Sequence, residues 1–185
     1  MWQQAIQSID AKMKKSVDVA REELSKIRTG RANPHLLDAI RVDYYGTPTA
    51  LKQLAAVTAP EPRLLIIQPF DAGIVGEIHK TIAASDMGLQ PQIDGRMIRI
   101  PIPALSKERR EDLAKIVKKV AEDGRVSVRA VRRDGNEDIK KLEKDKKLTE
   151  DDRKKALDEI QKITDRHTKA LDDLADAKEK EVLTA

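Results

Sequence analysis

The sequence contains no cysteine and very few aromatic residues. Without cysteine, neither a disulfide nor a thiolate metal site can form, which fits the reducing cytoplasm. Aromatic residues make up only 2% of the chain, so flat platforms for stacking unpaired bases are nearly excluded. No apolar run approaches the length of a membrane span, and the first residues lack the pattern of a signal peptide. We therefore expect a cytoplasmic protein with no membrane contact and no thiol chemistry.

The usual signatures of catalysis are also missing. No glycine-rich phosphate loop occurs, and no Ser, Thr or Lys has a plausible general base beside it. The histidines, His35, His79 and His167, lie far apart without ligand spacing, and His167 falls in an apolar helical stripe. Asp151 and Asp152 are better explained as acids at a helix N-terminus than as a metal site. The sequence predicts no enzyme activity, no catalytic residue, no metal and no cofactor.

Charge is abundant but unevenly distributed. Charged residues make up 37% of the chain, and the net charge is +4. Residues 1–30 carry +2 and residues 105–147 carry +5, whereas residues 31–104 are neutral and residues 148–185 carry −3. A polyanionic partner would meet the basic side of such a molecule. We expect the first two helical segments to present that positive side and the acidic third segment to leave them free.

Three long segments have helical periodicity. Apolar residues recur three or four apart in residues 3–28, 106–147 and 149–182. Gly30 stands where a left-handed residue would end the first helix, and Ser106 and Thr149 are placed to cap the other two. Gly124 and Gly135 occupy positions in the apolar stripe of the second helix. Three helices with one stripe each predict an antiparallel three-helix bundle.

Residues 31–104 have a different pattern. Residues 39–45 alternate like a strand, residues 63–68 are an apolar run, and Asp71 can cap a helix that extends to Ser85. Asp94-Gly95 is a hairpin signal, followed by a strand with Ile98, Ile100 and Ile102 on one face. The prediction is an α+β protein: a three-helix bundle of residues 1–30 and 105–185, with a small β/α/β domain of residues 31–104 inserted.

Basic residues gather on the predicted helices. Arg125, Arg129, Arg132 and Arg133 fall within about a third of the circumference of the second helix. On the first helix, Lys14, Arg21 and Arg28 recur every seven residues. Such runs are often no more than the solvated face of a bundle. However, arginine grips phosphate with two parallel hydrogen bonds, so the cluster favours a phosphate-rich partner.

Several stretches resemble bacterial ribosome recycling factor in the same order along the chain. They are Lys26–Pro34, Tyr44–Pro48, Ser85–Leu89, Ile98–Pro103, Glu108–Arg110 and Val128–Asp134. The resemblance covers the whole chain, and the ordered set is highly specific. Lys107 and Gly135 depart from the family pattern, and Gly135 would soften its helix by about 1 kcal/mol.

The resemblance implies a monomeric, L-shaped molecule that binds large-subunit rRNA of the post-termination ribosome. With elongation factor G, and GTP hydrolysis by that partner, the subunits are split and mRNA is released. Carried onto this sequence, the implied rRNA contacts are Arg132, which is the strongest candidate, Arg129, Arg133, Arg28 and Arg31. The implied hinge lies where the chain crosses between the domains, at Thr29, Gly30, Pro103, Ala104 and Leu105.

Two other functions fit parts of the pattern. An oligomeric coiled-coil chaperone or scaffold would pair the apolar stripes between chains, and light scattering would detect it. A phosphate-handling enzyme would bind nucleotide to the isolated protein, for which the sequence offers no loop.

Overall fold

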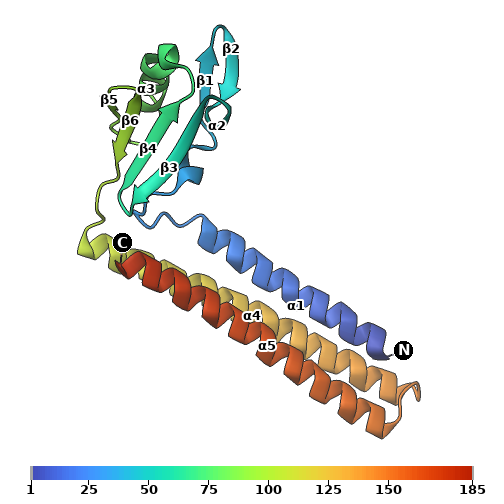
Figure 1. Ribbon diagram of the computed structural model, residues 1–185. Helices are drawn as coiled ribbons and strands as arrows, with labels where there is room; N and C mark the ends of the chain where they lie inside the picture. The colour runs from blue at the N-terminus through green and yellow to red at the C-terminus, as the bar shows by residue number, and fades with distance from the viewer. Residues whose placement is uncertain (1, 185) are drawn as a thin grey trace. The chain divides into compact units, whose positions relative to one another are not determined.

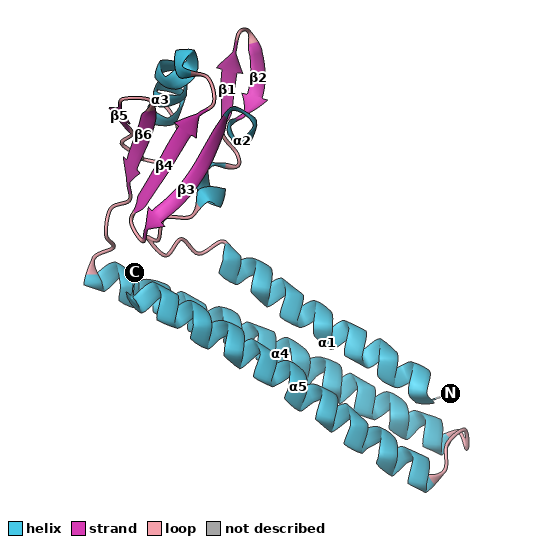
Figure 2. Cartoon of the chain, in the orientation of Figure 1, coloured by secondary structure: helices cyan, strands magenta, loops and turns pink. Residues whose placement is uncertain are grey.

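The computed structural model describes residues 2–184, which form two compact units. The helical unit contains the residues up to Arg28 together with Lys107–Thr184, and the sheet unit is Thr29–Ser106. All strands lie in the sheet unit, where Figure 2 draws them in magenta. Each boundary lies two residues from the expected one, because Gly30 packs against Leu105: a Cβ on Gly30 would lie 2.9 Å from Leu105 Cγ.

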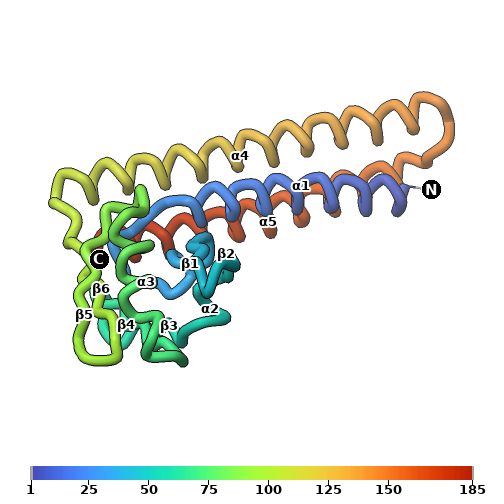
Figure 3. Tube along the Cα trace, turned by 90° about the horizontal axis from the view of Figure 1, so that it is seen from above, coloured from blue at the N-terminus to red at the C-terminus, as the bar shows by residue number. Residues whose placement is uncertain are grey.

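The helical unit is a bundle of three helices, α1 (Trp2–Ser25), α4 (Lys107–Lys144) and α5 (Glu150–Thr184). The start of α1 lies at the same end of the bundle as the turn between α4 and α5 (Figures 1 and 3). The predicted stripes form its core. Buried members include Ile6, Ile9, Met13, Val17, Ala20, Val128, Ile139, Ala156, Ile160, Ile163 and Leu171. The three-helix bundle is therefore confirmed, and no helix within residues 2–184 is long and apolar enough to cross a membrane.

The helix ends differ in part from the prediction. The α1 helix ends at Ser25 rather than at residue 28, because the Lys26 N–H donates to Glu23 O, three residues back, at 3.3 Å. Gly30 does adopt a left-handed conformation, with φ of 73°, but it lies five residues beyond the helix and does not cap it. At the start of α5, Thr149 Oγ1 accepts a hydrogen bond from Asp152 N at 3.2 Å, which confirms the predicted cap.

Two glycines allow α4 to approach its neighbours closely. A Cβ on Gly124 would lie 2.9 Å from Leu171 Cδ2 of α5, and a Cβ on Gly135 would lie 2.6 Å from Ile9 Cδ1 of α1. Both separations are shorter than carbon atoms tolerate without movement. Gly135 therefore does more than soften the helix, since it makes room for the side chain of Ile9.

The sheet unit contains a hairpin and a four-stranded antiparallel sheet. The hairpin pairs β1 (Arg41–Tyr44) with β2 (Thr47–Ala50). The sheet has the order β3-β4-β6-β5, formed by β3 (Ala55–Glu61), β4 (Leu64–Pro69), β5 (Gln92–Asp94) and β6 (Met97–Pro101). The remaining elements are the helices α2 (Leu51–Leu54) and α3 (Val75–Ala83) and the 3-10 turns η1 (Pro34–Leu37) and η2 (Ala72–Ile74).

The predicted apolar faces build the core of this unit. Leu65 and Ile67 of β4 and Ile98 and Ile100 of β6 are all fully buried. They pack with α3, whose residues Ile78 and Ile82 are also fully buried. Asp71 caps the start of the helical segment as expected, although η2 comes first: its Oδ1 accepts a hydrogen bond from Gly73 N at 2.8 Å.

The sequence does not predict β2, α2 or β3. Pro48 lies in β2, opposite Asp43, where the pattern indicates that the strand region ends. In β3, Pro60 interrupts a weakly apolar run, and the register shifts between Thr58 and Glu61. Proline lacks the N–H that a central strand needs, so these strands are found at sheet edges, where their sequence signal is weak.

The turn between β1 and β2 is strained. It has two residues, Tyr45 and Gly46, with φ of 50° and 88°. Both values are positive, as in a type I′ turn, which favours Asn-Gly and lets the strand twist continue. A tyrosine in the left-handed region costs about 1–2 kcal/mol relative to an ordinary backbone conformation.

We predict that Gly135→Ala destabilises the bundle although alanine is the better helix former. Overpacking against Ile9 costs about 1–3 kcal/mol, whereas helix propensity returns about 1 kcal/mol. Ile9→Val removes the Cδ1 atom that lies 2.6 Å from the new methyl group. In that background, Gly135→Ala should raise the free energy of unfolding, as measured by urea denaturation.

The matched control is Gly76→Ala in α3, where a Cβ would meet nothing within 4 Å. That change should be neutral or slightly stabilising in either background. Additive effects of Gly135→Ala and Ile9→Val would show that close helix approach is not why position 135 holds glycine.

Candidate nucleic-acid interface

Three of the predicted arginines lie together on α4. Arg129, Arg132 and Arg133 line one open groove of about 600 Å³. Asn136 and Lys140 extend it along α4, and α5 contributes Gln161. We call Arg129, Arg132, Arg133 and Lys140 the arginine surface.

The helix itself sets this arrangement. Residues three, four, seven and eleven apart return to nearly the same side of an α-helix, so the arginines and Lys140 share one side of α4. The fully buried Val128 and Ile139 fix which side that is: Arg132 lies one turn after Val128, so the arginines border the buried face of α4.

The arginine surface is only weakly engaged within the protein. Arg132 Nη1 donates to Gln161 Oε1 at 3.4 Å, and Arg133 Nε lies 3.8 Å from Asp134 Oδ1. Arg129 Nη2 lies 3.3 Å from Glu122 Oε1, and its side chain is 52% exposed. Exposed pairs of this length contribute little, so these guanidinium groups can turn to a phosphate at small cost.

Arg125 belongs to the same predicted cluster but has a different role. Its Nε binds Glu122 Oε2 at 2.9 Å and its Nη1 binds Asp172 Oδ1 of α5 at 2.6 Å. The hydrogen bond to Glu122 and the contacts with Asp172 raise the pKa of Arg125, and the same arginine lowers the pKa of Glu122. Arg125 ties α4 to α5 and has little capacity left for an external anion.

Arg28 and Arg31 are exposed but do not join the groove. Arg28 follows the end of α1 in the helical unit, and Arg31 belongs to the sheet unit. Ala20 of α1 packs near Gly124, and Ile9 packs near Gly135, so α1 runs antiparallel to α4. On that register the end of α1 lies about 20 Å along the bundle from Arg132. The structure thus brings together three of the five predicted arginines.

The expected single positive side, shared by the first two helices, is not formed. Arg21 of α1 lines a hollow with Leu174 and Lys178 of α5. On α4, Arg125 and Arg132 also contact α5, through Asp172 and Gln161. Both basic stripes therefore border the acidic α5 helix from opposite sides, because each stripe flanks the part of its helix that packs on α5.

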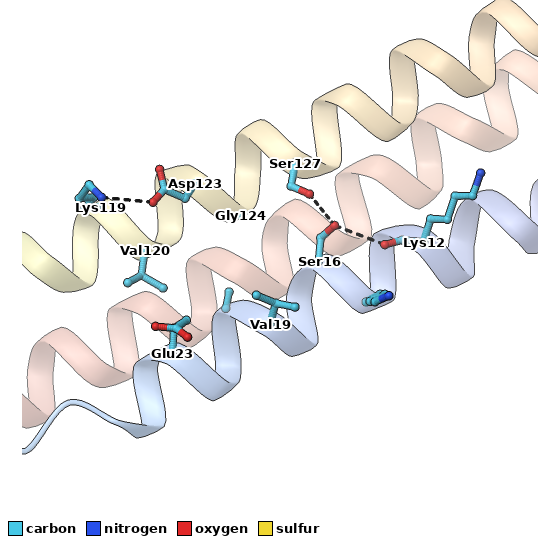
Figure 4. Close-up of a pocket in the computed structure, with 11 residues that line it drawn as sticks. Lys12, Ser16, Val19, Glu23, Lys119, Val120, Asp123, Gly124 and Ser127 are labelled. Atoms are coloured by element: carbon cyan, nitrogen blue, oxygen red, sulfur yellow. Dashed lines mark hydrogen bonds and ion pairs between the residues drawn. The ribbon is translucent and has the colours of Figure 1, made fainter.

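A second groove lies between α1 and α4 (Figure 4). Its volume is about 580 Å³, and Ser16 Oγ and Ser127 Oγ bridge the two helices at 2.8 Å. The apolar Val19 and Val120 line it, and its charges are mixed and partly paired, as in Lys119 with Asp123 at 3.7 Å. This groove lacks the arginine concentration of the other and fits phosphate less well.

The three histidines have separate structural contacts. His35 Nδ1 lies 3.0 Å from Asp38 Oδ2, and His79 Nε2 lies 3.0 Å from Pro91 O. His167 is buried in the bundle as predicted, with Nε2 2.5 Å from Asp10 Oδ1 of α1. No group of three potential metal ligands occurs among residues 2–184.

Sequence reasoning missed the other polar residues of the groove, Asn136, Glu137, Lys140 and Gln161. Lys140 lies seven residues after Arg133 and Asn136 lies four after Arg132, so helical spacing alone could have found both. Gln161 comes from another helix, and no feature of its local sequence marks it. Only the packing of α4 on α5 places it beside Arg132.

The chain matches the family model described as "Ribosome recycling factor" over residues 20–183. It is 53% identical over 175 residues to a ribosome-recycling factor of Alkaliphilus metalliredigens, covering 95% of each chain. It is 51% identical over 183 residues to one of Bacillus cereus, covering 99% of each chain.

Two solved structures are similar over nearly the full length. One is a solution structure of the ribosome recycling factor, with a TM-score of 0.74 at 36% identity, covering 100% of this chain and 98% of that one. The other, with a TM-score of 0.64 at 44% identity and 99% coverage of each chain, is the T. thermophilus factor. That factor is described, with E. coli elongation factor G, as bound to the E. coli post-termination complex.

We predict a pH-dependent contribution from Asp10. Hydrogen bonds from His167 and from Arg166, whose Nη2 lies 2.7 Å away, lower the pKa of Asp10. A lowered carboxyl pKa stabilises the fold at higher pH, and this stability is lost as the pH falls through the folded-state pKa. Asp10→Asn should therefore lower the melting temperature by about 2–4 °C at neutral pH, and the difference should shrink in the acid range.

The control is Asp18→Asn, which removes an exposed pair with Lys14 within α1. Its effect should be much smaller, because exposed pairs within a helix contribute little. A difference between the wild type and Asp10→Asn that stayed constant down to strongly acidic pH would contradict the assignment.

Proposed function

Because the chain belongs to the ribosome recycling factor family, we propose that it binds the post-termination ribosome through the arginine surface of α4. The contact is with rRNA of the large subunit. With elongation factor G and GTP hydrolysis by that partner, binding leads to subunit splitting and release of mRNA. The protein acts by binding, in the cytoplasm, and the nucleotide chemistry belongs to its partner.

The observation that carries this proposal is the groove lined by Arg129, Arg132 and Arg133. Folded RNA presents phosphates at regular spacing, and a rigid helix can hold several guanidinium groups against them. The scarcity of aromatic side chains fits recognition of phosphates and shape rather than stacking on bases. Arg132 is the strongest candidate, because it lies between Arg129 and Asn136 in the groove. Arg28 and Arg31 remain candidates for separate contacts.

The protein acts as a monomer in this proposal. Each helix already buries its apolar stripe within the chain, and Met13, Val17 and Ile160 are almost completely buried. A coiled-coil scaffold would need such stripes to pair between chains. Light scattering that gives a dimer or larger species at micromolar concentration would favour the scaffold function instead.

Ribosome binding should depend on the arginine surface, whereas the stability of the fold should not. We predict that Arg132→Ala weakens co-sedimentation with 70S ribosomes about tenfold, the loss expected for one charge-assisted contact. Its melting temperature should change by less than about 2 °C, because within residues 2–184 the hydrogen bond of Arg132 is the long one to Gln161. Arg125→Ala should show the reverse pattern, since it loses two short ion pairs.

Salt dependence supplies a second measurement for the same surface. Each lost phosphate contact should reduce the slope of log affinity against log salt by roughly one, so Arg129→Ala with Arg132→Ala should flatten it by about two. Lys119→Ala is the matched control: it removes one charge from α4 at an exposed site in the other groove. An unchanged slope in the double variant would remove the arginine surface from the interface.

The two units are further proposed to move relative to one another at Thr29, Gly30, Pro103, Ala104 and Leu105. Only two segments of chain join the units, near the boundaries after Arg28 and after Ser106. Relative motion is the ordinary expectation for domains joined by so little chain. In recycling, such motion would let elongation factor G push the sheet unit while the bundle stays bound to rRNA.

Single-molecule energy transfer tests this hinge, and the absence of cysteine makes labelling clean. One dye pair joins the units, through Asp94→Cys in the sheet unit and Asp138→Cys on α4. The control pair, Glu108→Cys and Asp138→Cys, lies along α4 at about 45 Å. We expect a broader distance distribution for the first pair than for the control. Equal widths would mean that the two units behave as one rigid body.

A further inference from the structure

Two aromatic side chains of the sheet unit are unusually exposed. The chain has only four aromatic residues, yet Tyr45 is 79% exposed and Phe70 is 72% exposed. They exceed every other exposed large apolar side chain among residues 2–184. Aromatic side chains normally contribute large buried areas to a core. In this fold, two of the four aromatic side chains are instead exposed to water.

The two residues lie at the same end of the sheet unit. Tyr45 is in the turn between β1 and β2, and Phe70 follows β4 (Figure 1). Tyr45 Oη donates a hydrogen bond to Asp71 Oδ2 at 3.4 Å, which joins the turn to the residue after Phe70. The rings of Tyr44 and Tyr45 pack edge to face, with ring centroids 4.7 Å apart. We call Tyr45, Phe70 and Asp71 the aromatic–acid patch.

The backbone at Tyr45 is not what a tyrosine prefers. Its φ of 50° lies in the left-handed region, where asparagine or glycine would complete the type I′ turn with less strain. The side chain is exposed, so the core does not require it either. A residue that is both strained and exposed points to a role outside the stability of the fold.

The charge of the patch selects the kind of ligand. Residues 43–48 and 69–74 contain two aspartates and no lysine or arginine. The negative charge of Asp71 also raises the pKa of the Tyr45 phenol. A phosphate would be repelled here, whereas a cation would be attracted both by the carboxylate and by the faces of the rings.

Arginine fits better than lysine. A guanidinium is planar, so it can stack on an aromatic face while its N–H groups bind a carboxylate. Asp71 accepts one bond from Gly73 N and one from Tyr45, and a carboxylate offers about four acceptor positions. Acceptor capacity therefore remains on a side chain that its own hydrogen bonds hold in place.

We propose that the aromatic–acid patch docks an arginine side chain presented by a cationic segment of a partner protein. A protein partner is favoured over RNA because the segments that form the patch carry only negative charge. This inference goes beyond the proposed function, which uses the arginine surface of the other unit, and it does not rest on it.

The test uses the isotope-labelled full chain and a capped tri-arginine peptide as the probe, followed by nuclear magnetic resonance. We expect saturable shifts of the Tyr45, Phe70 and Asp71 amide signals, and weaker binding of a capped tri-lysine peptide at the same place. Tyr45→Asn and Phe70→Ala should each weaken the arginine peptide about fivefold. Tyr45→Asn should keep or raise the melting temperature, so its loss of binding cannot be ascribed to unfolding.

Asp94→Asn is the matched control, because it removes an exposed carboxylate from a different turn of the same unit. It should leave binding of the peptide at the patch unchanged. Three results would overturn the proposal: peptide shifts confined to other acidic sites, equal affinity in Tyr45→Asn, or shifts of the patch by oligouridine but not by tri-arginine. Self-association that shifts the patch signals would assign it to a second copy of this chain and would equally overturn the proposal.

Discussion

Close packing of α4 against both of its neighbours is the constraint on which the helical unit depends. At Gly124 and Gly135 there is no space for even one additional carbon, so α1 and α5 are held in fixed register along α4. That register determines which residues of each helix face the core and which face water. Because a helix is rigid, burial of Val128 and Ile139 also fixes the direction of Arg129, Arg132 and Arg133, which border the buried face of α4.

The same packing divides the arginines of α4 into two roles. Arg125 lies close enough to Asp172 of α5 to form a short ion pair, and Glu122 neutralises it further. Arg132 follows Arg125 by about two helical turns, and its hydrogen-bond partner on α5 is the neutral Gln161, at a longer distance. An arginine without a strong internal partner keeps its capacity for phosphate, so the acidity of α5 restricts where an anion can bind.

The two units differ in how they use charge and aromatic residues. The helical unit concentrates guanidinium groups on a helix and suits a polyanion. The sheet unit is electrically neutral as a whole, but it exposes two aromatic rings beside a carboxylate. The two surfaces are therefore opposite in character: the arginine surface suits a polyanion, and the aromatic–acid patch suits a cation.

Much of this protein can be predicted from its sequence, because helical and strand periodicity are local properties. The three long helices, the cap at Thr149 and the apolar faces of β4, β6 and α3 all follow from the spacing of residues near one another. Helical spacing alone likewise predicts that Arg129, Arg132 and Arg133 share one side of α4. The edge strands β2 and β3 could not be predicted, since their short runs contain proline and little apolar signal.

Contacts between segments that are distant in sequence were decided only by the tertiary structure. The fold pairs Arg125 with Asp172, 47 residues away, which distinguishes Arg125 from the other arginines of α4. It also places Gln161 in the groove. It also turned both basic stripes toward α5 and joined Tyr45 to Asp71, and it gave Gly135 a packing role that helix propensity alone does not reveal. The physical reason is that periodicity predicts which face of an element is buried, but it does not predict which residues of another element that face contacts. That choice is made by close packing of the whole core.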